Sequence, residues 1–170
     1  MLLGRAVPLV ALIALLTAPV AAWAKPLGLG DNYGTLSILR GKGTVEVQAT
    51  GALIGQVRKG KVKVKIFKNK HGGDHGQVII RMRGQGTVRH KQNGTVVYDG
   101  RRIRIRIVDE KFRVQINGGG IHLSAVAQGN CTLQAAPDAA DPGVFQLNIG
   151  PYQALPPDQT TYPLNASSHV

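Results

Sequence analysis

The chain has 170 residues, with 21 Lys and Arg against 9 Asp and Glu, a formal net charge of +12 and a single cysteine. This length suits one domain with its own hydrophobic core, and one cysteine excludes an intramolecular disulfide framework. Because 17 of the 21 cations lie in residues 58 to 113, the charge points to an anionic partner.

The N-terminus has the pattern of a secretory signal peptide. Arg5 precedes an apolar run, and Ala22-Trp23-Ala24 supplies the small residues of a cleavage site before Lys25. The alternative is a retained membrane anchor, but the run contains Pro8 and Pro19 and is short for a bilayer span. We therefore expect residues 1–24 to be removed, residues 25–34 to lead into the fold, and the protein to be exported to the periplasm, cell envelope or exterior. No later segment is apolar and long enough to span a membrane.

Strict alternation of cations and branched aliphatic residues marks two strands. Residues 61–66 read Lys-Val-Lys-Val-Lys-Ile and residues 102–107 read Arg-Ile-Arg-Ile-Arg-Ile, so each strand has one buried and one exposed face. Weaker strand patterns occur at 35–40, 44–49, 52–58, 77–83, 87–92, 95–98, 111–117, 121–128 and 131–134. With no helical periodicity after the signal peptide, residues 35–134 are predicted to form one antiparallel all-β domain.

Glycine-containing segments separate these strands. Asn93-Gly94 and Asp99-Gly100 suit two-residue hairpin turns. Looser turn signals are Lys59-Gly60, Gly84-Gln85-Gly86, Gly118-Gly119-Gly120 and Gly129-Asn130. Since short links join antiparallel neighbours, we expect a meander.

A weak internal repeat suggests how this meander folds. The segment Gly41-Lys42-Gly43-Thr44-Val45 resembles Gly84-Gln85-Gly86-Thr87-Val88, so residues 36–67 and 79–108 are interpreted as two similar three-strand units. Chance resemblance between Gly- and Val-rich strands is the alternative. Two units are too few for a solenoid, which leaves closure as a β-sandwich or a barrel.

The C-terminal part has a different composition. Six prolines within residues 135–164 remove backbone donors, so this segment cannot be central sheet. We expect it to be extended and to cover the domain, with Val144, Phe145, Leu147 and Ile149 able to form an edge strand. Residues 165–170 are expected to be a disordered tail.

The basic strands supply the candidate binding site. Six cations alternate with aliphatic residues and would share one exposed sheet face if the two units pack side by side: Lys61, Lys63, Lys65, Arg102, Arg104 and Arg106. Such a face suits acidic wall polymers, anionic glycans or lipid head groups. The alternative is that the charges only prevent edge-to-edge aggregation.

Other chemistries find less support. A single-strand nucleic-acid binder usually stacks bases on aromatic residues, and no aromatic pattern accompanies the basic strands. No carboxylate pair, G-x-S-x-G motif or activated nucleophile is evident, so we do not expect an enzyme or a cofactor. Cys131 would need a base such as His90 or His122 to act as a nucleophile, and we expect it to point into the sheet as a small apolar residue.

One polar cluster suggests a metal site. His71, Asp74 and His75 lie in the glycine-rich segment between two strands, and His90 or His122 could complete a set of ligands for zinc or copper. A solvated hairpin loop explains the same residues. We therefore rank a non-catalytic module that binds anionic envelope or extracellular material first, a metal-binding protein or metalloenzyme second, and a basic nucleic-acid binder third.

Overall fold

The computed structural model describes residues 32–67 and 76–166 of the chain. They form seven strands and, within these ranges, no helix, which confirms the all-β prediction. The strands are β1 (Gly34–Phe67), β2 (Gln77–Met82), β3 (Gly86–His90), β4 (Val96–Ala135), β5 (Val144–Leu147), β6 (Gln153–Ala154) and β7 (Thr160–Leu164).

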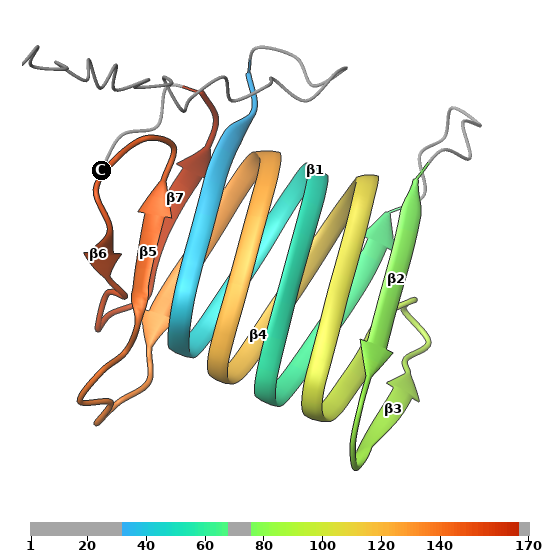
Figure 1. Cartoon of the computed structure of the whole chain (residues 1–170). Helices are drawn as coiled ribbons and strands as arrows, with labels where there is room; N and C mark the ends of the chain where they lie inside the picture. Colours follow the sequence, from blue (N-terminus) through green and yellow to red (C-terminus); the bar gives the residue numbers. More distant parts are fainter. Residues whose placement is uncertain (1–31, 68–75, 167–170) are drawn as a thin grey trace, which may run out of the picture.

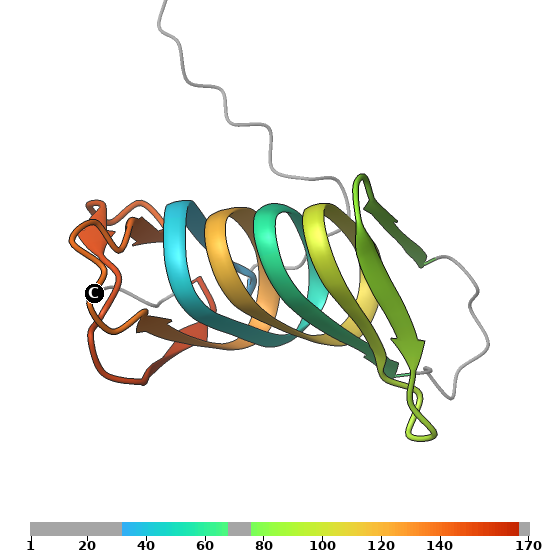
Figure 2. The same ribbon diagram turned by 90° about the horizontal axis from the view of Figure 1, so that it is seen from below.

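Two very long strands, β1 with 34 residues and β4 with 40, make up most of the fold. They run antiparallel, and much of β1 is bonded to β4 along both of its edges. Val47, for example, lies between Val114 and Cys131, and Val57 lies between Ile103 and Ile121. The two strands therefore wind together as a flattened coil (Figures 1 and 2) in which turns of β1 and β4 alternate.

The coil has two broad sides, which we name after the short strands at their edges. The β2 side comprises β5, segments 36–39 and 53–57 of β1, segments 103–107 and 121–125 of β4, and β2. The β3 side comprises β7, segments 44–49 and 62–66 of β1, segments 96–99, 112–117 and 131–134 of β4, and β3. Figure 1 shows the β2 side in front.

The core lies between these two sides. Alternate residues point inward, as the period of two requires, so Ile105 and Leu123 of the β2 side join one buried cluster with Val64 and Val114 of the β3 side. The predicted alternation is confirmed for both basic strands, since Val62, Ile103 and Ile107 are fully buried as well. The C-terminal segment contributes Phe145, Leu147, Leu155 and Leu164 to the same cluster.

One rim of the coil, where the chain bends between the two sides, is built on glycine. Five glycines from neighbouring turns are in register there: Gly43, Gly118, Gly60, Gly100 and Gly86, in that order across the sheet. Gly60 shows the reason, because its φ is +155° and a Cβ at this position would lie 2.3 Å from the backbone oxygen of Asn117. The sharp bend thus brings adjacent backbones together without breaking the ladder.

This glycine rim corrects the predicted meander. Lys59-Gly60, Asp99-Gly100, Gly118-Gly119-Gly120 and Gly129-Asn130 are not hairpin turns but bends within β1 or β4. Each stays in the sheet because strands from distant parts of the sequence pair with it on either side, as Gly100 and Gly118 do with Gly60.

Asn93-Gly94 does lie in a hairpin turn, but the turn is not the predicted two-residue kind, because Gly94 has a positive φ and Asn93 does not. The turn joins β3 to β4, with the Lys91 amide donating to the Thr95 carbonyl over 2.8 Å and Gly94 at φ +77°. The backbone amide of Thr95 also donates to Oδ1 of Asn93.

The described residues form one antiparallel sheet that is not closed on itself. Its strand order runs β2-β4-β1-β5-β6, with β3 and β7 paired to β4. Closure as a sandwich or barrel is therefore not confirmed, and neither are the two repeat units, because 36–67 lies within the single strand β1 whereas 79–108 covers parts of β2 and β4 together with β3. The expected signal peptide, residues 1–24, lies outside the described residues.

Candidate anion-binding surface

The lysine triplet lies on the β3 side, where each ammonium group has a neighbour. Lys61 forms an ion pair with Asp99 at 3.4 Å, Lys63 donates to Oε1 of Gln115 at 3.0 Å, and Nζ of Lys65 lies 5.3 Å from the centroid of the Phe67 ring. These contacts are a surface ion pair, a hydrogen bond and a cation–π interaction. Each of the three lysines therefore has a partner of its own within the fold.

Two of the three arginines lie on the other side of the coil. Arg104 and Arg106 are exposed on the β2 side, and Arg102 lies at the adjoining glycine rim with a φ of +53°. The structure thus does not bring the six predicted cations onto one shared face. It places Lys63 and Lys65 on the β3 side and Arg104 and Arg106 on the β2 side, whereas Lys61 and Arg102 line one hollow at the glycine rim.

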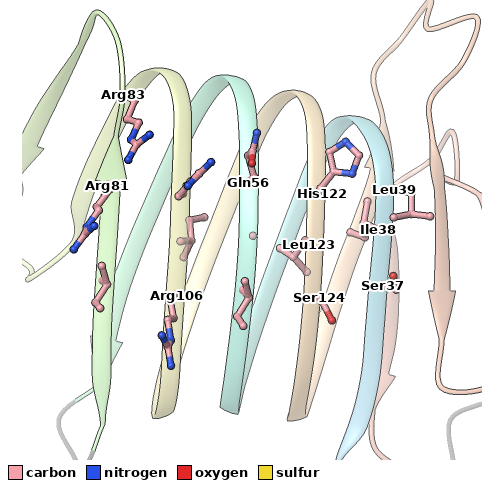
Figure 3. Close-up of a pocket in the computed structure, with 15 residues that line it drawn as sticks. Ser37, Ile38, Leu39, Gln56, Arg81, Arg83, Arg106, His122, Leu123 and Ser124 are labelled. Atoms are coloured by element: carbon pink, nitrogen blue, oxygen red, sulfur yellow. The ribbon is translucent and has the colours of Figure 1, made fainter. Parts of the chain in front are cut away.

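Two further arginines complete a cluster on the β2 side. Arg81 of β2 is directly opposite Arg104 in register, and the amide of Arg83 donates to the carbonyl of Arg102 over 3.2 Å. We call Arg81, Arg83, Arg102, Arg104 and Arg106 the arginine cluster; all five are exposed. In Figure 3, Arg81, Arg83 and Arg106 lie along two adjacent strands.

The contribution of β2 was missed by the sequence analysis. Arg81 and Arg83 are two residues apart, the same spacing that marked 102–107, but only within a weaker strand pattern. That period of two was the available signal. Their pairing with 102–106 was not readable, because it depends on which segment of the chain borders β4.

Among the described residues, no carboxylate forms an ion pair with the cluster. In the part of the chain that the structure describes, ion pairs join Arg40 to Asp141, Lys61 to Asp99 and Arg113 to Glu46, and none involves the arginine cluster. Like charges directly opposite each other on a sheet are destabilising. The cross-strand pairing of Arg81 with Arg104 therefore lowers the stability of the sheet, and no ion pair among the described residues compensates for it.

An open hollow of about 630 Å³ crosses this surface (Figure 3). Its lining combines Arg81, Arg83, Arg104 and Arg106 with Gln56, His122, Ser37 and Ser124 and the aliphatic residues Leu39, Ile54 and Ile79. A second hollow of about 600 Å³ begins at Arg83 and Arg104 and continues to the rim, where Arg40, Lys42, Arg58 and Arg102 line it together with Asp141, which pairs with Arg40. Cations therefore outnumber carboxylates along the surface from the β2 side to the glycine rim.

The metal and nucleophile hypotheses find no site in the described residues. His71, Asp74 and His75 lie outside them. His122 is on the β2 side and His90 is on β3, and no group of three or more potential ligands gathers in the ranges described.

Cys131 is fully buried in the core, as expected from its position in the pattern. Burial raises the pKa of its thiol to about 12. A thiol that resists ionisation in this way is a poor nucleophile.

Comparisons with protein-family models, with curated proteins and with solved structures gave no match to this chain. Within 32–67 and 76–166, no helix is present that could cross a membrane. The geometry and charge of the surface itself are therefore the basis for a function.

Proposed function

We propose that this protein is a non-catalytic binding module that holds anionic envelope or extracellular material on its arginine cluster. The observation that carries the proposal is the direct pairing of Arg81 with Arg104, neither of which forms an ion pair with a carboxylate in the described ranges. Like charges held together in this way are relieved when an anion binds between them.

The chemistry of the arginine side chain favours an anionic ligand with oxygen acceptors. Guanidinium groups present several donors in a fixed plane and bind phosphate, sulfate or carboxylate through two hydrogen bonds at once. All five members of the cluster are arginine. The cluster therefore offers five such planar donor groups to an anionic ligand.

The scaffold and the location form part of the same proposal. We propose that the two sides of the coil act as the layers of a β-sandwich, which would keep the cluster rigid. We also propose that the protein acts after export, where acidic polymers and lipid head groups are accessible.

The metal-binding alternative depends on His71, Asp74 and His75, which lie outside the described residues. The nucleic-acid alternative has little support from stacking residues, since His122 is the only ring side chain in the lining of the two hollows described above, with no Phe, Tyr or Trp.

Two triple variants test the proposal. Replacing Arg102, Arg104 and Arg106 by Gln should weaken binding to dextran sulfate at least tenfold, because each surface cation contributes about 1 kcal/mol to attraction by an anionic surface. Replacing Lys61, Lys63 and Lys65 by Gln removes the same charge from the β3 side and should have a much smaller effect. Both affinities can be measured by titration at low and physiological salt.

Salt provides the second arm of this experiment. Exposed charges are screened beyond about 8 Å at physiological ionic strength, so the wild-type affinity should fall steeply as salt rises. Equal losses in the two triple variants would mean that only net charge matters, and retained binding in the arginine variant would refute the proposal.

A further inference from the structure

The arginine cluster is interleaved with exposed aliphatic side chains. Ile54 is 58% exposed and Leu39 is 39% exposed, and both line the same hollow as Arg104 and Arg106. In register across the β2 side, Ile54 lies between Ser124 and Arg106, and Arg106 lies between Ile54 and Ile79. An arginine is thus flanked by an isoleucine on either side.

A soluble polyanion does not account for these aliphatic residues. Outward positions of a sheet in water are ordinarily polar, and on the β3 side they are mostly so, as at Glu46, Gln115 and Asn117, although Val88 of β3 is 46% exposed. A highly charged polymer gains nothing from contact with isoleucine. The partner of the β2 side therefore needs anionic groups and apolar groups within the same few ångströms.

We infer that the β2 side docks on a lipid bilayer that contains anionic head groups. This rests on the proposed function and names its ligand. The arginines would bind the phosphates, while Ile54 and Leu39 would enter the boundary between head groups and acyl chains, as the apolar residues of interfacial proteins do. The shape agrees, because neighbouring strands are about 4.8 Å apart and the hollow spreads across β2 and four adjacent turns of β1 and β4 rather than forming a narrow cleft.

The charges are arranged to suit such an orientation. Cations continue from the β2 side onto the glycine rim through Arg58 and Lys42, so the positive surface borders the aliphatic residues along one edge. Attraction to anionic lipids is strongest for cations close to the membrane plane. Docking on the β2 side would bring this positive surface to the membrane together with Ile54.

Vesicle sedimentation distinguishes this inference from simple polyanion binding. Ile54→Ser should lower binding to phosphatidylglycerol-containing phosphatidylcholine vesicles by about tenfold, since burying one isoleucine side chain is worth a factor of this order. The same variant should bind dextran sulfate as the wild type does. Vesicles of phosphatidylcholine alone should bind weakly to both.

The chain offers a matched control in Ile149, which is 93% exposed and does not line the hollow. Ile149→Ser should leave binding to both ligands unchanged. All variants should be made in residues 25–170, the chain expected after signal cleavage, so that any contribution from the N-terminal segment is common to them. Circular dichroism should show that each variant is folded.

The outcomes separate the two proposals. If dextran sulfate binds through the arginines but Ile54→Ser leaves vesicle binding unchanged, the bilayer inference is wrong and the proposed function stands. If Ile54→Ser weakens dextran sulfate binding equally, the isoleucine has no specific role toward lipid and the inference is again overturned. If neither ligand binds the wild type, the proposed function itself fails.

Discussion

The two sides of the coil carry the same alternating pattern but handle their charges differently. On the β3 side, Lys61 has Asp99, Lys63 has Gln115 and Arg113 has Glu46 at 2.8 Å. On the β2 side, Arg104 faces Arg81. Alternation therefore tells which residues are exposed, whereas the neighbouring strand decides whether an exposed cation is already satisfied or available to a ligand.

The largest effect is expected where the two sides are joined. Gly60→Ala should destabilise the protein by about 3 kcal/mol or more, because the new Cβ would meet the backbone of Asn117 at a positive φ. Gly119→Ala is the matched control at the same rim, where, among the described residues, a Cβ would come within 4 Å of Cγ of Lys42 alone, at 3.9 Å.

Urea denaturation gives the free energy of unfolding of both glycine variants. The control should remain within about 0.5 kcal/mol of the wild type. Equal stability of the two variants would show that the rim is not tightly packed, and the coupling between the β2 and β3 sides would then need another explanation.

Removing one cation should change the free energy of unfolding in opposite directions on the two sides. Arg113→Gln loses the ion pair with Glu46, whose side chain is 21% exposed, and should cost about 0.5 to 1 kcal/mol. Arg104→Gln relieves the contact with Arg81 and should stabilise the protein by a few tenths of a kcal/mol.

Denaturation at low salt is the appropriate measurement, because screening at high salt should shrink both effects. If Arg104→Gln proved destabilising, the arginine cluster would hold interactions within the fold, and the contrast between the sides would disappear.

The smallest effect concerns Cys131, which belongs to the interior behind the β3 side. With its pKa raised to about 12 by burial, this thiol should react with a disulfide reagent at pH 8 only as fast as the protein opens. In denaturant the reaction should be rapid, since an ordinary thiol has a pKa of about 8.5.

The same shift in Cys131 gives a pH dependence. The folded state holds the proton more tightly than the unfolded state, so the contribution to stability is complete below about pH 8.5 and decreases as the pH rises toward 12. As for the labelling experiment, a rapid reaction of Cys131 with the disulfide reagent in the native protein would show that the β3 side is more open than its packing indicates.

From the sequence alone, the period of two predicted strands at 61–66 and 102–107, placed Val62 and Ile103 in the core and left the cations outside. This was possible because the alternation of side chains across a strand is a local property of the backbone. The same pattern at Arg81 and Arg83 was readable but weaker.

The winding of the sheet and the composition of each surface were decided only by the tertiary structure. A glycine in a bend within β1, such as Gly60, looks locally like a glycine in a hairpin turn, and the difference arises from Gly100 and Gly118 pairing on either side of it. The arginine cluster likewise exists because β2 pairs with the 103–107 segment of β4. Such pairings join residues far apart in the chain, so no local pattern in the sequence reveals which cations will meet each other and which will meet a partner.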